Sequence, residues 1–236
     1  GKVLEPLIAL RDSTELTGAG KGLAFQLAET LGVLPRTGVA AFVKNIDQGE
    51  RAKLRRLGVR FGEHYIYMPA LIKPAPSAMK LRLWRIALRV ETPLSIPAAG
   101  LSSVPADPAM PEGYYLISGY AVCGPRAIRI DMFERLLVQL RQKNAAGPFP
   151  LTAQLWSPVG CGVNDFEAVM RALDYAPTDH GEIAKADGAA PEIAVTAGPD
   201  LEDAAASEDE AEEQLLMALE DTAPPEPDIS QEENLE

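Results

Sequence analysis

Residues 47–68 read DQGERAKLRRLGVRFGEHYIYM, and this stretch decides the fold class because it changes from a helical to a strand pattern at one glycine. Asp47 and Glu50 have the spacing of a capping box, in which each residue satisfies an amide of the other. This box predicts a helix over residues 48–57. Gly58 is well placed as the C-cap that ends it.

The second half of the stretch has the pattern of a β-hairpin. Residues 59–68 alternate and are rich in β-branched and aromatic side chains. Gly62 and Glu63 are placed for a tight type II′ turn between two strands. A helix followed directly by a hairpin indicates a mixed fold.

Further helices are predicted on both sides of this stretch. Apolar spacing indicates helices within residues 3–16 and 23–31, the latter ended by Gly32. Two more capping boxes predict helices near 132–143, from Asp131 with Glu134, and near 165–174, from Asn164 with Glu167.

Residues 77–90 (SAMKLRLWRIALRV) predict a helix that begins at a possible Ser77 N-cap and has two apolar stripes. One stripe is Met79, Leu83, Ile86 and Val90, and the other is Leu81, Trp84 and Leu88. We therefore expect this helix to be sandwiched between neighbours, with a narrow polar strip of Arg82, Arg85 and Arg89.

The next part of the chain predicts a long loop and then strands. Residues 94–113 contain four prolines, which favours a loop. Residues 114–124 and 127–131 have the composition of short strands. The fold class expected is thus α+β: a mainly helical module with a small antiparallel sheet and hairpins, the latter near 59–68 and 114–130.

Charge divides the chain into two parts. Residues 1–176 contain 21 Lys and Arg against 15 Asp and Glu, a net charge of +6, whereas residues 177–236 have a net charge of −18. The second part lacks aromatic residues, so it cannot bury enough apolar area to offset the entropy of ordering. We expect a folded module over 1–176 and a disordered acidic tail over 177–236.

Several classes of chemistry are not supported by the sequence. Residues 18–22 (GAGKG) look like a phosphate-binding loop, but Gly22 replaces the hydroxyl residue that holds magnesium, and helical spacing precedes the loop. We interpret this stretch as a junction between helices. Cys123, Cys161 and the two histidines lack the spacing of zinc ligands, and no catalytic or metal-binding residue is assigned. Residues 209–212 (DEAE) resemble a helicase DExx box without the strand that such a box needs.

The chain has no apolar run near the roughly 20 residues that cross a bilayer, and no leader peptide is recognisable. A soluble, cytoplasmic protein without a membrane partner is expected. Because the sequence opens at Gly1 inside a helical pattern, we also expect further sequence before it in the natural gene product.

Basic residues concentrate between residues 51 and 89 and predict contact with nucleic acid. Clustered arginines neutralise phosphates and bind them in bidentate geometry. Tyr65 and Tyr67 on the adjoining hairpin are candidates for stacking on exposed bases. The alternative is a solvated helix face with core tyrosines. The candidate nucleic-acid-binding residues are Arg51, Arg55, Arg56, Arg60, Arg82, Arg85 and Arg89.

Four segments together resemble a known family. They are LGVRFG (57–62), PALIKP (69–74), GYAVCGPRAIRIDMFERL (119–136) and VGCGVNDFEAVMRALDY (159–175). In this order they resemble the C-terminal, non-motor region of alphaproteobacterial helicase-related proteins, which are relatives of the mitochondrial degradosome RNA helicase. The resemblance covers residues 1 to about 176, and the acidic tail has no matching counterpart.

The resemblance implies an accessory part of a superfamily-two, ATP-dependent helicase. Its two motor domains, with ATP and magnesium, would lie upstream, and this chain alone would hold no cofactor and would not be catalytic. The implied partners are single-stranded RNA or DNA, the motor domains and an RNA-degradation partner.

Two further alternatives concern protein contacts. The module is also interpretable as a docking module that binds the motor domains or a degradosome partner without touching nucleic acid. In the tail, residues 207–221 (SEDEAEEQLLMALED) have the pattern of a short amphipathic helix for a partner groove. The tail is alternatively a solubilising extension, or an acidic segment that lies across the basic surface.

Overall fold

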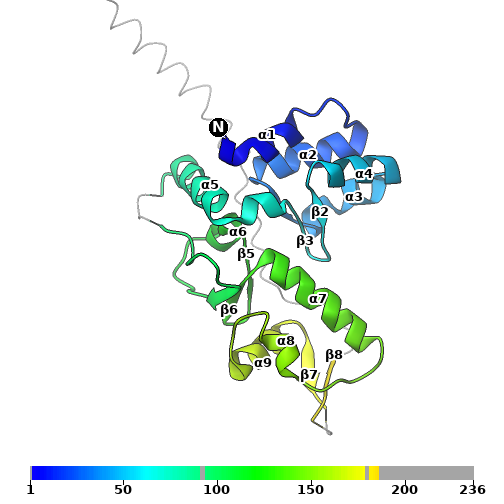
Figure 1. Ribbon diagram of the computed structural model, residues 1–236, viewed down its shortest axis with the longest axis vertical. Coiled ribbons are helices and arrows are strands. Elements are labelled where there is room, and N and C mark those ends of the chain that lie inside the picture. Colours follow the sequence, from blue (N-terminus) through cyan, green and yellow to red (C-terminus); the bar gives the residue numbers. More distant parts are fainter. Residues whose placement is uncertain (1, 91–93, 179–180, 186–236) are drawn as a thin grey trace, which may run out of the picture. The chain divides into compact units, whose positions relative to one another are not determined.

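The protein has an α+β fold in which helices pack with small antiparallel sheets, as predicted (Figure 1). A computed structural model describes residues 2–90, 94–178 and 181–185. Residues 186–236 lie outside the described part. The prediction of a disordered tail from residue 186 onward, and that of an amphipathic helix over 207–221, therefore fall on residues that the structure does not describe.

The N-terminal elements share one core. Fully buried Leu10, Leu23, Leu54 and Ile66 come from three helices and a strand, and they belong to a single apolar cluster. The strand order of the sheet is β1-β3-β2, with both pairs antiparallel. The elements are η1 (Lys2–Leu4), α1 (Glu5–Arg11), α2 (Gly18–Glu29), β1 (Val33–Pro35), η2 (Thr37–Val39), α3 (Ala40–Asn45), α4 (Gln48–Arg56), β2 (Arg60–Phe61), β3 (Tyr65–Tyr67) and η3 (Pro69–Ile72).

The predicted hairpin is present, but its turn differs from the prediction. Phe61 pairs with Ile66, and the Gly62 amide donates to the Tyr65 carbonyl at 2.8 Å, so the two residues at the turn are Glu63 and His64 rather than Gly62 and Glu63. Gly62 lacks the positive φ that a type II′ turn requires at its first central position, whereas Gly58 has φ +93° after α4, as expected of a C-cap glycine.

Helix α5 (Pro74–Ala87) is packed on one side only, so the predicted sandwich is wrong. Leu81 and Trp84 pack with Tyr114 and Ile117 of α6 (Tyr114–Ser118). Met79, Leu83 and Ile86 of the other predicted stripe are exposed, whereas Val90 is partly buried against this cluster. Ser77 lies inside the helix rather than at its N-cap, which is Lys73.

The C-terminal elements form a second core around α7 (Ile130–Asn144). Phe133 and Phe166 are fully buried in it. The second sheet has the order β4-β6-β5, in which β4 lies within the predicted loop. The remaining elements are β4 (Ser103–Pro105), β5 (Tyr120–Cys123), β6 (Arg126–Arg129), α8 (Ala153–Trp156), α9 (Val163–Ala172), β7 (Tyr175–Pro177) and β8 (Ile183–Lys185).

Residues 114–118 form the short helix α6, although a strand was predicted there. Gly113 and Gly119 flank the helix with φ of +81° and +89°, which is the left-handed conformation that only glycine adopts at little cost. These two glycines bracket one helical turn, and β5 begins directly after it.

The capping boxes formed only in part. Asp47 accepts the Glu50 amide at 2.8 Å and caps α4 as predicted, but the Glu50 side chain binds elsewhere. Helix α7 begins at Ile130, so Asp131 is already helical.

The third predicted box is absent. Helix α9 starts at Val163 after Gly162, so Asn164 lies within the helix rather than at its cap. The Glu167 carboxylate lies 3.9 Å from Arg171 instead of at the helix start.

Order extends past residue 176, where the tail was expected to begin. β8 pairs with β7, and Ile183 is buried and exchanges two backbone hydrogen bonds with Phe149, at 3.0 and 2.8 Å. One apolar side chain thus anchors a segment that composition assigns to the tail. Within the described ranges, no helix is long and apolar enough to cross a membrane.

Candidate nucleic-acid interface

Arg51, the first predicted phosphate contact, is committed to the protein itself. Its Nη2 donates to the Val43 carbonyl at 2.6 Å and its Nε to the Ile46 carbonyl at 3.3 Å. These carbonyls lie at the end of α3, where helical acceptors lack intrahelical partners. The guanidinium also lies 5.4 Å from the centre of the Phe61 ring. Arg51 therefore caps a helix and stabilises the hairpin.

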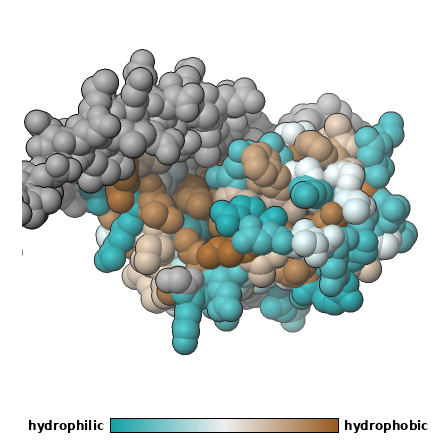
Figure 2. All heavy atoms as spheres, turned by 90° about the horizontal axis from the view of Figure 1, so that it is seen from above, coloured by the Kyte–Doolittle hydropathy of each residue, from teal (hydrophilic) through white to brown (hydrophobic). Residues whose placement is uncertain are grey.

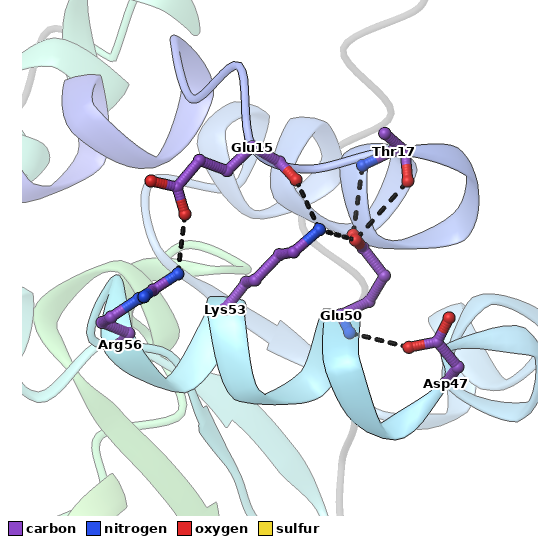
Figure 3. Close-up of polar contacts among 6 residues, drawn as sticks. All are labelled: Glu15, Thr17, Asp47, Glu50, Lys53 and Arg56. Atoms are coloured by element: carbon purple, nitrogen blue, oxygen red, sulfur yellow. Dashed lines mark hydrogen bonds and ion pairs between the residues drawn. The ribbon is translucent and has the colours of Figure 1, made fainter.

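The next cations of α4 take part in a polar network with the segment before α2 (Figure 3). Arg56 is paired with Glu15 at 2.7 Å, and Lys53 donates to Glu50 at 2.6 Å and to the Glu15 carbonyl at 2.8 Å. Glu50 also accepts the Thr17 amide at 3.1 Å. The Lys53 hydrogen bond holds the pKa of the Glu50 carboxyl below its ordinary value. The Arg56–Glu15 pair is exposed and contributes little stability, so a phosphate can compete for that arginine.

The same network explains the glycine-rich stretch. Gly20 lies against the Glu50 carboxylate, and a Cβ there would overlap its Oε2 atom. A Cβ on Gly22 would lie 2.5 Å from the Phe42 ring. Both glycines are inside α2, so they serve helix packing rather than a phosphate loop.

A groove of about 650 Å³ lies between the β2–β3 hairpin and α7, where Figure 1 shows the tip of the hairpin directly over the helix. Arg60, one of the predicted residues, lines it together with Arg36, Arg135 and Arg141. Arg60 and Arg135 are exposed. The groove therefore brings together arginines from three distant segments of the chain.

The acidic residues of this groove already have partners. Glu63 pairs with Arg141 at 3.0 Å, and Asp131 is held by Arg129 through two contacts of 2.6 and 3.0 Å. Arg36 donates to the Gly62 carbonyl at 2.8 Å. By contrast, no carboxylate among the described residues lies within ion-pair distance of Arg60 or Arg135.

The buried carboxylate of Glu134 organises the hairpin turn. Its Oε2 accepts the Glu63 amide at 2.5 Å, and its Oε1 accepts the amides of His64 at 3.0 Å and Tyr65 at 2.7 Å. Burial raises the pKa of Glu134, although these three donors oppose the increase. This residue was predicted to cap its own helix. It instead fixes the hairpin against α7 and so shapes the groove.

The predicted stacking tyrosines are mainly core residues. Tyr65 is 3% exposed and packs edge-on against Phe133 at 6.1 Å. Burial raises the pKa of its phenol. Tyr67 is 8% exposed and lines the groove, as does the partly exposed Phe61, which also packs against the N-terminal core. Base contact in the groove is therefore available to Phe61 and the edge of Tyr67, but not to Tyr65.

The remaining predicted arginines form separate groups. Arg55 is exposed on α4 and lies 5.9 Å from the Phe61 ring centre. Arg82, Arg85 and Arg89 line another groove of about 430 Å³ at the end of α5. Figure 1 places α5 and α4 on opposite sides of the view, so the seven predicted residues do not form one surface.

The α5 arginines border an exposed apolar stripe. Met79, Leu83 and Ile86 are 37%, 41% and 76% exposed. Figure 2 shows hydrophobic surface gathered on the side of the molecule where α5 and α1 lie, interrupted by hydrophilic side chains. Arg82 and Arg89 are exposed beside this stripe, whereas Arg85 donates to the Val90 carbonyl at 3.4 Å.

The sequence interpretation missed Arg36 and Arg135. Neither lies in the basic segment, and only the long-range docking of the hairpin on α7 brings them to Arg60.

Comparisons of the chain with known protein families, with curated proteins and with solved structures found no significant match. In the part of the chain that the structure describes, no group of three or more His, Cys, Asp or Glu side chains is arranged to hold a metal ion.

Proposed function

We propose that this protein binds single-stranded nucleic acid through its phosphate backbone, along the groove between the β2–β3 hairpin and α7. Arg60 and Arg135 are the main phosphate contacts; Arg36 adds the donors that the Gly62 carbonyl leaves free, and Arg55 and Arg56 flank the path on the α4 side. Phe61 provides a ring on which an unstacked base can rest.

The observation that supports this proposal is that the acidic groups of the groove have hydrogen-bond or ion-pair partners, whereas two of its arginines have no acidic partner in the described part of the chain. Its carboxylates are satisfied by amides or by other arginines, whereas Arg60 and Arg135 have no carboxylate within reach among the described residues. An exposed guanidinium in a concave surface attracts a bidentate anion such as a phosphate. The proposal also agrees with the family resemblance, under which the chain is the accessory part of an ATP-dependent helicase.

The test is a titration of labelled RNA and DNA oligonucleotides with the full chain over a salt series. Three phosphate contacts predict a slope of about −2 for the logarithm of affinity against the logarithm of salt concentration. The double variant Arg60→Gln, Arg135→Gln should reduce the slope to about −0.7.

Arg11→Gln is the matched control, because Arg11 is an exposed arginine that already pairs with Asp12 at 2.8 Å. It should leave both slope and affinity unchanged. An affinity that does not depend on salt would contradict the proposal.

A second candidate function has its own observation, the exposed stripe on α5. An apolar stripe bordered by Arg82 and Arg89 fits an amphipathic helix with acidic flanks from a partner protein. This is the docking alternative, in which the motor domains or a degradosome component supply the partner.

The two functions are separated by variants of α5. If docking is the function, Leu83→Glu and the triple change of Arg82, Arg85 and Arg89 to Glu should each abolish binding of an acidic amphipathic peptide. Neither change should alter oligonucleotide binding. A loss of oligonucleotide affinity in the triple variant alone would instead add α5 to the nucleic-acid surface.

A further inference from the structure

Helix α5 presents an apolar stripe and a row of arginines side by side. The stripe is Met79, Leu83 and Ile86, which are exposed and lie at positions i, i+4 and i+7 of one helical face. The groove at the end of the helix is lined by three arginines together with Ile86 and Val90, and none of the described residues that line it is acidic. The outer surface of α5 therefore combines uncovered apolar area with positive charge.

Arg89, at the end of this surface, occupies a backbone position where glycine is usual. Helix α5 ends in a Schellman motif, in which the Val90 amide donates to the Arg85 carbonyl at 2.9 Å. The Arg89 amide donates to the Ile86 carbonyl at 3.2 Å, as the same motif requires. Arg89 has φ +51° there, the left-handed conformation in which a residue with a Cβ is strained and glycine is not. The chain keeps a guanidinium at this position although it lowers stability, which indicates a binding role for the charge.

The complementary chemistry occurs in the chain itself, in residues 207–221 (SEDEAEEQLLMALED). Seven of these fifteen residues are acidic and none is basic, so the segment attracts arginines. Leu215, Leu216 and Leu219 have the spacing of one helical face, and with Met217 they are the densest group of large apolar residues in 186–236. The segment lies outside the described residues, and its sequence predicts an amphipathic helix that matches α5 in apolar pattern and in charge.

The chain is long enough for this segment to reach α5. The last described residue is Lys185, and 21 residues separate it from Ser207. Fully extended, such a length spans roughly 70 Å. A compact domain of about 180 residues has a radius of gyration of roughly 16 Å, so its opposite faces are closer together than that. Binding within one chain is therefore sterically possible.

We propose that residues 207–221 bind α5 of the same chain, with the leucines of the segment on the apolar stripe and its carboxylates at Arg82 and Arg89. The occupant of the docking surface is then a segment of this protein rather than a separate one. A partner that uses α5 must first displace the segment, which makes docking there autoinhibited. The inference does not depend on nucleic-acid binding, because the groove between the hairpin and α7 is lined by other residues.

The experiment measures the affinity of a fluorescently labelled synthetic peptide, residues 207–221, for the full chain. The natural chain already contains the competing segment at an effective concentration of about 1 mM, which for a dissociation constant of about 0.1 mM weakens binding of the peptide about tenfold. Replacing Leu215, Leu216 and Leu219 by Ser in the full chain removes the competitor. This serine variant should therefore bind the peptide about tenfold more tightly than the natural chain.

A matched control changes three other apolar residues outside the described part to Ser. They are Ile193, Leu201 and Leu235. This control should bind the peptide as weakly as the natural chain does, because it leaves the competing segment intact.

Arg89→Gly, made in the serine variant, tests the charge without damaging the fold. It should weaken peptide binding about two- to fivefold, as expected for loss of one exposed ion pair. It should also leave Tm unchanged or raise it, because glycine relieves the left-handed backbone. A purely structural role for Arg89 predicts the opposite, a lower Tm with unchanged binding. Arg11→Gln removes an exposed arginine elsewhere and should change neither quantity.

The inference is overturned if the natural chain and the serine variant bind the peptide equally. It is also overturned if Arg60→Gln with Arg135→Gln, in the serine variant, abolishes peptide binding, since the segment then belongs in the groove. A natural chain that dimerises, with a monomeric serine variant by light scattering, would show that a second copy supplies the segment and would overturn binding within one chain. Each outcome leaves the oligonucleotide titration as a separate test of the groove.

Discussion

Glu134→Gln is the substitution that most directly tests how the hairpin is held on α7. The carboxylate is 6% exposed and accepts three backbone amides, two at Oε1 and one at Oε2. In glutamine, the carbonyl oxygen can keep the amides of His64 and Tyr65. The new amino group then faces the Glu63 amide, donor against donor.

The cost follows from one lost charge-assisted hydrogen bond and one unsatisfied amide. Each contributes about 1–3 kcal/mol, but the loop is partly exposed and burial already disfavours the ionised carboxyl. We therefore expect a total loss of about 1–3 kcal/mol of unfolding free energy, which for a domain of this size lowers Tm by about 2–12 °C. Glu134→Ala leaves three amides unsatisfied and should cost at least about 3 kcal/mol.

The assay is urea and thermal unfolding followed by tryptophan fluorescence, which reports on Trp84 and Trp156 in different parts of the fold. Glu167→Gln is the control, because this α9 carboxylate is exposed and only 3.9 Å from its partner. It should change stability by no more than about 0.5 kcal/mol. The reasoning is refuted if Glu134→Gln is as stable as that control.

Other features give shorter tests. Gly20→Ala should destabilise the α2–α4 contact, seen as a lower urea midpoint, because its Cβ overlaps the Glu50 carboxylate; an unchanged midpoint would show that Glu50 moves at no cost. Burial lowers the pKa of Lys80 to about 7, so the folded state excludes a proton that the unfolded state binds up to the ordinary lysine pKa. Unfolding free energy should therefore rise with pH above about 7 by up to about 1.4 kcal/mol per pH unit, and Lys80→Met should abolish that rise. Burial raises the pKa of the Cys123 thiol to about 12, whereas Cys161 is only partly buried. Native protein should thus show at most one slowly reacting thiol towards a disulfide reagent, and Cys161→Ser should remove it.

Local signals in the sequence predicted the elements that depend on neighbours in the chain. Asp47 caps α4, Gly58 follows it in the left-handed conformation, and residues 59–68 form a hairpin. Each of these features is decided by interactions within a few residues, where capping and turn chemistry operate.

The predictions that were wrong depend on contacts between residues far apart in the chain. Glu134 has the spacing of a capping residue, yet it accepts backbone amides of the hairpin turn, about 70 positions earlier in the chain. A sequence pattern that spans a few residues cannot predict such a contact. The Met79 stripe has the period of a buried face but is exposed, because periodicity shows that a face is apolar and not that something covers it. Ile183 shows the converse, since one apolar side chain in an acidic context was enough to extend the fold.

The candidate site in the structure differs from the one predicted from the sequence, for a reason that composition cannot show. A count of cations treats every arginine between residues 51 and 89 alike, but Arg51 satisfies the carbonyls of Val43 and Ile46 at the end of α3. A guanidinium that already has acceptors gains little from a phosphate, because binding must first break those contacts. Arg60 and Arg135 have no such cost, since the groove's carboxylates are held by amides and by other arginines. Availability of the donors, rather than density of charge along the sequence, is therefore the reason for which we propose a phosphate path between the hairpin and α7.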